Sequence, residues 1–299
     1  MRIVFLGTPQ FAVPTLEALA RVHEIALVVA QPDKPAGRGM KMQAPAIAIK
    51  ATELGLPLAQ PAKVRDPEFL ARVAELRADA GVVIAYGKIL PASLLELPRH
   101  GFLNVHASIL PYYRGAAPIQ RAIENGERET GVTIMRVDEQ LDHGAMFAIA
   151  RTEIGADERT PSLAARLSSL GADALLRVLD DIARGVAIET PQPHELATHA
   201  AKIEKEEGHI RWTDSARTIY DKFRAFDPWP GVYTDALKLV DVARADGSGT
   251  PGAVLSVDDD GVVVACGDGA LRVKTVQRAG KPKMTAADYV RAAQLSHLS

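Results

Sequence analysis

The first two thirds of the chain alternate short apolar runs with amphipathic stretches, and this alternation restricts the fold more than any other feature. The apolar runs are RIVFLG (2–7), IALVVAQ (25–31), AGVVIAY (80–86), GFLNVHA (101–107) and GVTIMRV (131–137). Helical periodicity separates them in PQFAVPTLEALA, APAIAIKATELG, DPEFLARVAELRA and PIQRAIENG. Nearly continuous apolar strands flanked by helices predict a Rossmann-like α/β fold, with helices on both faces of a mostly parallel sheet.

The pattern changes after a long predicted helix at 160–185. Residues 186–210 are rich in proline and charge and are typical of a linker. Beyond them, one helix and about five short strands separated by Gly and Asp predict a smaller C-terminal OB-like β-barrel, with an open β-sandwich as the alternative. We therefore expect an N-terminal domain at 1–188, a linker at 189–206 and a barrel domain at 207–299.

The composition fits a globular protein. Of 299 residues, 47% are hydrophobic, which is enough for one large core or two ordinary ones. No apolar run approaches the roughly 18 residues of a membrane helix, and the run in MRIVFLGTPQF is too short for a signal peptide. We therefore expect a cytoplasmic protein without a membrane segment.

The cysteine and histidine content and the net charge bear on disulfides, metal sites and nucleic-acid binding. The single cysteine, Cys266, excludes an internal disulfide framework, and the eight histidines show no spacing such as HExxH. We expect no metal. The formal net charge is −2, so a nucleic-acid partner would require a local basic patch rather than an overall positive field.

The stretch NVHASILPYYRGAAPIQRAI, residues 104–123, is the first candidate for chemistry. Side chains two apart in a strand share a face, so Asn104 and His106 point the same way near the carboxyl end of an apolar run. Ligands of α/β sheets bind beyond this end of the strands. Pro111 then fixes the backbone and Gly115 permits a close approach of main chain, as in a pocket wall.

A carboxylate partner lies in RVDEQLDHGAM, where Asp138 and Asp142 follow the next apolar run. If strands 101–107 and 131–137 run parallel, their carboxyl ends meet and one aspartate reaches His106. A carboxylate within hydrogen-bonding distance fixes the tautomer of an imidazole and favours its protonated form. Each residue alone is more often a turn or cap residue, so the residues by themselves leave a structural role open.

Long blocks of sequence also occur in a characteristic order. They are GTP, QPDKPAGRG, VVIAYGKILP, NVHASILPYYRGAAPIQRAI, GVTIMRVDEQLDHGAM, AFDPWPG and AGKPKMTAADYV. In this order, and over essentially the full chain, the sequence resembles the methionyl-tRNA formyltransferase family. The wider folate-dependent formyltransferases share the Asn, His and Asp, but RGAAPIQ, the PAGRG loop and an appended barrel resemble the tRNA-specific members best.

The resemblance implies an enzyme that transfers the formyl group of 10-formyltetrahydrofolate to the α-amino group of initiator methionyl-tRNA. Attack of the amine places negative charge on the formyl oxygen, which hydrogen-bond donors must stabilise. Asn104 and His106 would be these donors. Asp142 matches the family's catalytic aspartate and would orient His106 and relay protons. His143 stands where a small polar residue is frequent, and the resemblance gives it no role.

The resemblance also implies how the co-substrate is held. SILP matches a signature that is usually SLLP, and AYGKILP resembles the backbone segment that meets the pterin ring. The folate-binding residues would be Ser108, Ile109, Leu110, Pro111, Tyr86 and Gly87. Ordinary packing at a strand end is the alternative for Tyr86. Besides tetrahydrofolate and the tRNA as partners, we expect no membrane and a monomer.

The segment QPDKPAGRGMKMQAP carries three cations, Lys34, Arg38 and Lys41, against the single acid Asp33. A basic loop can order on a phosphate backbone, although in most proteins it would be a solvated surface. The resemblance implies contact with the acceptor end of tRNA, with Arg38 as the principal residue. The C-terminal domain has about as many acids as bases, so charge gives no support for a tRNA contact there.

Three other functions compete with this interpretation. A dinucleotide-dependent oxidoreductase would need GxGxxG after the first strand, but FLGTPQFA supplies only Gly7. A folate-dependent formyltransferase acting on an amino sugar or a nucleotide intermediate would differ in whether its C-terminal domain binds tRNA. A non-catalytic RNA-binding protein using the OB-like part would have no use for Asn104, His106 and Asp142.

Overall fold

The structure, a computed structural model, describes residues 1–36 and 41–298 and divides into two compact units. Unit 1 comprises Met1–Pro118, Glu129–Glu153 and Ala164–Ala200. Unit 2 comprises Ile119–Arg128, Ile154–Leu163 and Ala201–Ser299. The division therefore does not follow a single cut in the sequence, because two short internal segments pack with the C-terminal part of the chain.

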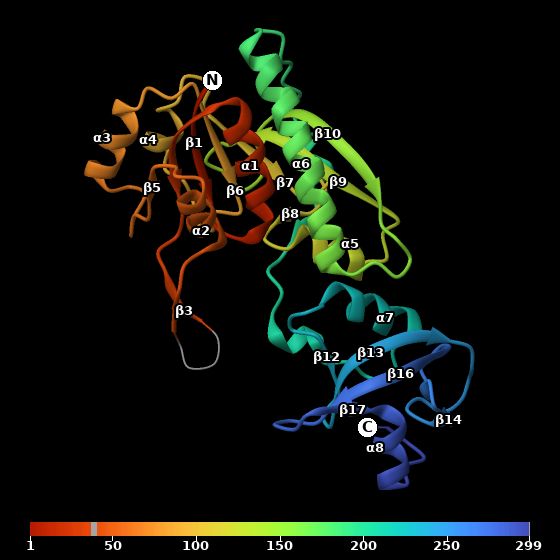
Figure 1. Ribbon diagram of the computed structural model, residues 1–299. Coiled ribbons are helices and arrows are strands. Elements are labelled where there is room, and N and C mark those ends of the chain that lie inside the picture. The colour runs from red at the N-terminus through yellow and green to blue at the C-terminus, as the bar shows by residue number, and fades with distance from the viewer. Residues whose placement is uncertain (37–40, 299) are drawn as a thin grey trace. The chain divides into compact units, whose positions relative to one another are not determined.

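Within the described residues, unit 1 is built on a seven-stranded sheet in the order β10-β9-β7-β6-β1-β2-β5 (Figure 1). The strands are β1 (Arg2–Gly7), β2 (Glu24–Val29), β5 (Leu58–Ala59), β6 (Ala80–Ile84), β7 (Phe102–His106), β9 (Glu129–Arg136) and β10 (Met146–Glu153). The first five of these run parallel, whereas β9 is antiparallel to both neighbours. The predicted mostly parallel α/β sheet is confirmed.

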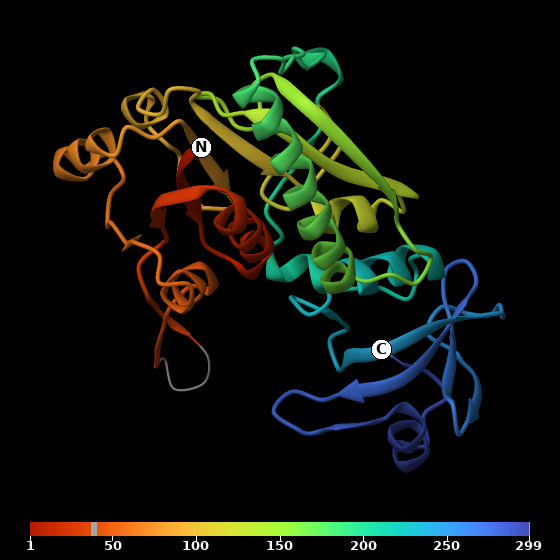
Figure 2. The same ribbon diagram turned by 45° about the horizontal axis from the view of Figure 1, so that its top comes forward.

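Helices cover both faces of this sheet, because successive side chains of its apolar strands point to opposite sides. On one face, Val4 and Leu6 of β1 share a core with side chains of α3 (Pro67–Glu75) and α4 (Ala92–Leu95). The other α-helices that precede the C-terminal part of the chain are α1 (Val13–Val22), α2 (Ala46–Glu53), α5 (Pro118–Glu124) and α6 (Thr160–Ala183). Figures 1 and 2 show α1 and α6 crossing the sheet on the same side.

Local signals in the sequence fix where α3 begins. The carboxylate of Asp66 accepts a hydrogen bond from the backbone N–H of Glu68 at 3.0 Å, and Pro67 occupies the first helical position. Both features satisfy or remove N–H groups that have no partner inside a helix. The apolar face that remains, with Phe69 and Val73, is buried against the sheet.

The pairing of β7 with β9 corrects one prediction. The two strands were expected to run parallel, but they are antiparallel, with Asn104 opposite Met135 and His106 opposite Thr133. The carboxyl end of β9 therefore does not meet that of β7. The chain folds back instead, and the N–H of Arg136 donates to the carbonyl oxygen of Ala145 at 2.8 Å. This return loop, rather than the strand end, brings Asp142 to β7.

Unit 2 contains an antiparallel sheet in the order β12-β13-β16-β15-β14, with β17 paired to β16. Its elements are α7 (Ala216–Ala225), β12 (Val232–Tyr233), β13 (Lys238–Ala245), β14 (Val254–Asp258), β15 (Gly261–Ala265), β16 (Ala270–Gln277), β17 (Lys283–Thr285) and α8 (Ala286–Ala293). This arrangement is consistent with the predicted small barrel. Helix α8 was not predicted from the sequence. It begins where the hydroxyl of Thr285 accepts from the N–H of Asp288 at 3.1 Å.

Buried polar contacts explain why the segment Ile154–Leu163 packs within unit 2. The guanidinium of Arg224 is buried and donates to the carbonyl oxygen of Glu158 at 3.0 Å. The hydroxyl of Thr160 donates to the carbonyl oxygen of Ala225 at 2.6 Å. A buried cation and a buried hydroxyl are costly without such partners, so these bonds hold the segment against α7.

The predicted basic loop at 31–45 contains a β-hairpin that the sequence analysis did not foresee. It consists of β3 (Lys34–Ala36) and β4 (Lys41–Gln43). Lys34 and Lys41 are exposed in it. Arg38 lies outside the described residues.

We expect Gly171 to be required for the packing of α6 on the sheet. A Cβ atom there would lie 2.5 Å from a methyl group of Val105, in the strand that carries the candidate site. Gly171→Leu should therefore cost about 2–3 kcal/mol through overpacking, which exceeds the gain of about 1 kcal/mol in helix propensity. Urea denaturation should show a lower midpoint.

The matched control is Asp173→Leu, which places the same side chain on the exposed face of α6. Its midpoint should stay near that of the unmodified protein. Equal midpoints for the two variants would contradict close packing at Gly171.

Candidate active site

Three polar side chains that the sequence analysis singled out converge in unit 1. Oδ1 of Asp142 lies 3.4 Å from Nδ2 of Asn104, which donates to it, and 3.6 Å from Nδ1 of His106. The side chains of His106 and Asp142 are only 6% and 11% exposed. A carboxylate and an imidazole so far removed from water interact more strongly than a surface pair would.

Strand β7 sets the orientation of the first two members of this cluster, Asn104 and His106. Asn104 and His106 share one face of the strand, as their spacing predicts, while Val105 points to the opposite face and faces α6. The hydroxyl of Thr133, opposite His106 on β9, donates to the carbonyl oxygen of Ser108 at 2.7 Å and accepts from the N–H of Leu110 at 3.1 Å. The chain after β7 is thus held close to the sheet.

The third member is held through both its main chain and its side chain. Asp142 adopts a left-handed backbone with φ of +49°, which few non-glycine residues tolerate. Its Oδ2 accepts the N–H of Gly115 at 2.9 Å. Gly115 has φ of +122°, and a Cβ atom there would lie 2.6 Å from the carbonyl oxygen of Ala200. The close main-chain approach predicted at Gly115 is therefore confirmed.

The tautomer of His106 follows from its second contact. Nε2 lies 2.9 Å from the carbonyl oxygen of Tyr113, which can only accept, so Nε2 carries a hydrogen and donates it. Tyr113 itself has a left-handed φ of +60°, which turns this carbonyl toward the ring. Nδ1 is consequently the ring atom on the side of Asp142. Main chain, and not only the carboxylate, orients the imidazole.

Most side chains of the SILP segment are buried and contribute to the packing of the fold. Ser108 is fully buried and its hydroxyl donates to the carbonyl oxygen of Tyr112 at 2.6 Å. Leu110 packs with Met135 and Met146 in a small buried cluster. Pro111 is buried, and Ile109 is the member of SILP that is partly exposed.

The AYGKILP segment exposes its backbone rather than its aromatic ring. Tyr86 belongs to the sheet core and is 2% exposed, and burial raises the pKa of its hydroxyl to about 12. Its carbonyl oxygen accepts the hydroxyl of Thr8 at 3.0 Å. Gly87 is exposed with φ of +82°, and Ile89 is 82% exposed. The packing alternative for the Tyr86 side chain is the one observed.

A polar cluster that the sequence analysis missed adjoins Asp142. Nδ1 of His143 lies 2.9 Å from Oδ2 of Asp138, and its ring stacks on that of His194 with centroids 3.9 Å apart. Arg114 donates to Nδ1 of His194 at 2.8 Å and to Oε1 of Gln192 at 2.6 Å. His143 thus has a structural environment, whereas Asp138 contacts His143 rather than His106.

A signal for one missed residue was present in the sequence. Thr133 carries the one hydroxyl in the apolar run GVTIMRV, and a hydroxyl that is buried needs a hydrogen-bond partner. Gln192 offered only its position between Pro191 and Pro193, which favours an extended chain and says nothing of a site.

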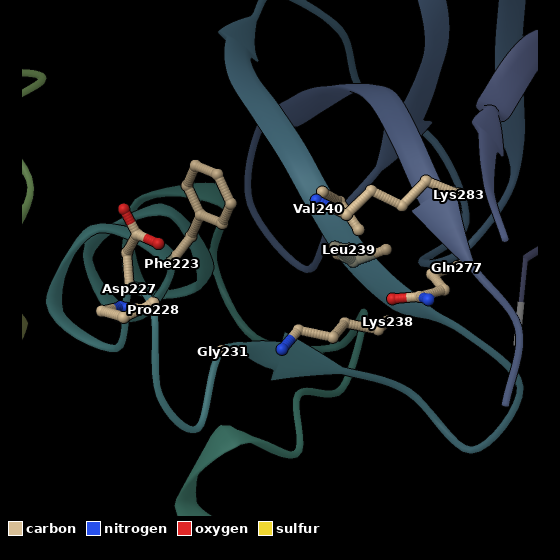
Figure 3. Close-up of a pocket in the computed structure, with 9 residues that line it drawn as sticks. All are labelled: Phe223, Asp227, Pro228, Gly231, Lys238, Leu239, Val240, Gln277 and Lys283. Carbon is tan, nitrogen blue, oxygen red and sulfur yellow. The ribbon is translucent and has the colours of Figure 1, made fainter. Parts of the chain in front are cut away.

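Other parts of the molecule offer weaker candidates. A small cavity in unit 2 is lined by Phe223, Asp227, Pro228, Gly231, Lys238, Leu239, Val240, Gln277 and Lys283 (Figure 3). It contains no residue of the predicted sites. The thiol of Cys266 is buried, and burial is the main cause that raises its pKa to about 11, so it is a poor nucleophile.

Within residues 1–36 and 41–298, no group of three or more His, Cys, Asp or Glu side chains is placed to hold a metal ion. Among the same residues, no helix combines the length and apolar character needed to cross a bilayer.

Comparison with protein families gives a match over nearly the whole chain. A family described as Formyl transferase matches residues 1–179, and one described as Formyl transferase, C-terminal domain matches residues 202–294. A methionyl-tRNA formyltransferase of Sorangium cellulosum is 49% identical, covering 97% of this chain and 96% of the relative. One of Thermus thermophilus is 45% identical with the same two coverages.

Solved structures show a similar fold at lower identity. The N-formyltransferase of Helicobacter canadensis, solved with folinic acid and dTDP-3-aminofucose, has a TM-score of 0.70 at 16% identity, covering 91% of this chain and 98% of that one. HypX of Aquifex aeolicus, solved with tetrahydrofolic acid, has a TM-score of 0.65 at 21% identity. The match covers 97% of this chain but 47% of HypX, so the chain spans about half of its length.

The contacts of the histidines predict their tautomers when the rings are neutral. His106 and His194 should carry hydrogen on Nε2, because Nε2 of His106 donates to a carbonyl and Nδ1 of His194 accepts from Arg114. His143 should carry it on Nδ1, which faces the carboxylate of Asp138. Long-range ¹H–¹⁵N correlation spectra at mildly alkaline pH will distinguish the two forms. Hydrogen on Nδ1 of neutral His106 would contradict the geometry.

Proposed function

This chain belongs to the methionyl-tRNA formyltransferase family, and we propose that Asn104, His106 and Asp142 are the residues that carry out its reaction. The enzyme transfers the formyl group of 10-formyltetrahydrofolate to the α-amino group of initiator methionyl-tRNA, for use in translation initiation. The observation that supports the assignment most directly is Oδ1 of Asp142, which faces Asn104 at 3.4 Å and His106 at 3.6 Å.

Asn104 supplies a hydrogen-bond donor to the reacting carbonyl group. Bound 10-formyltetrahydrofolate supplies a formyl group on a nitrogen that leaves as an amine. The side-chain amide of Asn104 has two hydrogens, of which one is directed to Asp142. The other is free to donate to the formyl oxygen as negative charge develops there.

His106 supports the same charge. Its Nε2 hydrogen is already donated to Tyr113, so a second hydrogen on Nδ1 makes the ring a cation next to the carboxylate of Asp142. That hydrogen lies on the same side of β7 as the amide of Asn104. Together the two residues place positive potential where the formyl oxygen gains charge.

Asp142 removes the proton from the attacking amine. Each oxygen already accepts one hydrogen bond, from Gly115 on Oδ2 and from Asn104 on Oδ1. A carboxylate has about four acceptor sites, so it can still take the proton that the amine releases, directly or through water, and return it to the departing folate nitrogen. The α-amino group of model compounds titrates near about 8, so a substantial fraction is already the neutral nucleophile near neutral pH. The chain therefore needs no covalent intermediate.

The folate is placed along two loops at the carboxyl edge of the sheet. We assign to it Ile109 and the exposed backbone around Gly87, with Ser108, Leu110 and Pro111 shaping the loop from within and Tyr86 anchoring the other loop in the core. Both loops follow strands adjacent in the sheet, β6 and β7. This placement agrees with the general rule for ligands of parallel sheets.

The tRNA is assigned to the hairpin of Lys34 and Lys41, with Arg38 as the principal residue of the same segment. Two exposed cations on one hairpin suit a phosphate backbone. We divide the chain into a catalytic domain at 1–188, a linker at 189–206 and a tRNA-binding barrel at 207–299, and the family matches at 1–179 and 202–294 support this division. A tRNA substrate also favours the cytoplasm.

The competing functions have less support. An amino-sugar or nucleotide formyltransferase would share the Asn, His and Asp, and solved sugar N-formyltransferases share the fold at 16–21% identity. Relatives that act on methionyl-tRNA are 41–49% identical over at least 96% of this chain. A purely RNA-binding role leaves the buried contacts of Asp142 without a purpose.

Substitution of the three residues should abolish most turnover. Asn104→Ala should lower kcat by about 10²–10³-fold through loss of one donor, and His106→Ala or Asp142→Asn by about 10²–10⁴-fold. The assay measures formyl-methionyl-tRNA formed from 10-formyltetrahydrofolate and methionyl-tRNA, and circular dichroism checks folding. Near-normal turnover in His106→Ala would remove the proposed mechanism.

The matched control is Asp138→Asn in the same loop. Asp138 contacts His143 and not His106, so its turnover should stay within a few-fold of the unmodified enzyme. A larger loss in Asp138→Asn than in Asp142→Asn would reverse the assignment of the two aspartates.

The hairpin cations should affect tRNA use alone. The double variant Lys34→Ala and Lys41→Ala should raise KM for methionyl-tRNA and reduce the salt slope of binding by about 2, one for each lost phosphate contact. KM for the folate should not change. Arg21→Ala, an exposed cation of α1, is the control. A change in folate KM alone would show that the hairpin is assigned to the wrong substrate.

A further inference from the structure

The segment expected to be a linker contains a buried amide. Gln192 is 4% exposed, although it lies between two prolines in a region rich in charge. Burying a side-chain amide is costly unless its hydrogen-bonding groups are satisfied. The partners of Gln192 therefore indicate what the segment does.

All hydrogen-bonding groups of this amide are used. Nε2 donates to the carbonyl oxygen of Asp142 at 3.0 Å and to that of Gly144 at 2.8 Å. Oε1 accepts from Nε of Arg114 at 3.1 Å and from Nη2 of the same guanidinium at 2.6 Å. An amide has two donors and one oxygen with two acceptor sites, so nothing is left unpaired.

The same segment also binds the loop after β7. Thr190 exchanges two main-chain hydrogen bonds with Met146, each 2.8 Å, at the end of the Asp142 loop. Further along, the carbonyl oxygen of Thr198 accepts the N–H of Arg114 at 2.9 Å, and β11 (His199–Ala200) pairs with β8 (Arg114–Gly115). The chain from Thr190 to Ala200 thus fixes both loops that converge on His106.

From this geometry we propose that Gln192 is a positioning residue for Asp142, holding its strained main chain so that the carboxylate faces Asn104 and His106. The inference rests on the proposed function, because it acts through the role assigned to Asp142. A left-handed backbone is unfavourable for a non-glycine residue and persists only where its surroundings fix it. Gln192 supplies that restraint by bonding the carbonyls on either side of His143.

The chemistry of an amide is needed at this position. Arg114 binds the oxygen, which turns the NH₂ group toward the two carbonyls. A carboxylate of the same shape would still accept from Arg114 but would oppose two carbonyl oxygens with an acceptor. Gln192→Glu therefore keeps the volume and replaces both donated hydrogen bonds by repulsion, which makes it the most direct probe.

The experiment compares Gln192→Glu in two backgrounds, the unmodified enzyme and Asp142→Ala. In the unmodified enzyme, kcat for formylation should fall by about 10–100-fold with little change in either KM, since a shift of about 1 Å at a catalytic group has this effect. In the Asp142→Ala background it should cause no further loss, because residues that act as a unit are not additive.

Two outcomes would overturn the proposal. They are an unchanged kcat in Gln192→Glu, and an equal fold-loss in both backgrounds, which indicates a general effect on the fold. Asp142→Ala with normal turnover would instead refute the role in the reaction proposed for Asp142. Should Gln192→Glu fail to fold, Arg114→Met frees the amide to rotate and should show the same non-additivity with a smaller loss.

Gln60→Glu is the matched control. Nε2 of Gln60 also donates two bonds, to the carbonyl oxygen of Gln31 at 2.9 Å and to Asp33 at 2.7 Å, but away from Asp142. It should leave kcat at saturating substrates unchanged. If it lowers kcat as much as Gln192→Glu does, the effect is not specific to Asp142 and the proposal fails.

Discussion

The carboxylate of Asp142 is the group on which the arrangement of the candidate site depends. One oxygen accepts the main-chain N–H of Gly115, and the other faces the amide of Asn104 and the ring of His106. A buried carboxylate without such partners would be unfavourable, so the contacts that make the site reactive also keep it folded. This carboxylate contacts strand β7 and the turn at Gly115 from the loop that carries Asp142. It therefore holds the three segments in place.

Backbone strain is concentrated where these loops meet. Ala85, Tyr113 and Asp142 follow β6, β7 and β9, and all three have left-handed backbones. Each has a separate restraint nearby: Thr8 bonds the carbonyl of Tyr86, Thr198 accepts from Tyr113, and Gln192 bonds Asp142. Strained residues of this kind persist only where the surrounding structure compensates for their conformational free energy. Here these hydrogen bonds at the edge of the sheet do so.

Antiparallel pairing at β9 has a consequence for chemistry as well as for topology. A parallel β9 would end beside His106 and present its aspartates directly. The antiparallel strand instead requires a return loop, and a loop can place a carboxylate over the face of β7 rather than at its end. The loop then needs restraint from outside itself, which explains why chain from beyond α6 is incorporated into unit 1.

The sequence by itself determined most of the elements and most of the residue set, although β5, β10, the β3–β4 hairpin and α8 were not predicted. Apolar runs with period two and helices with period 3.6 are local properties, so the α/β sheet, the later antiparallel strands, and the shared face of Asn104 and His106 could all be predicted. A close approach of main chain at Gly115 was also predicted, but its partner, Ala200, is distant in the sequence. The residues alone left Asp138 and Asp142 open, and the resemblance favoured Asp142. Only the tertiary structure decided the direction of β9 and the burial of Tyr86, Thr133 and Gln192. These depend on contacts between residues that are distant in the chain, such as Gln192 and Asp142, and no local pattern encodes which distant groups will satisfy a buried donor or acceptor.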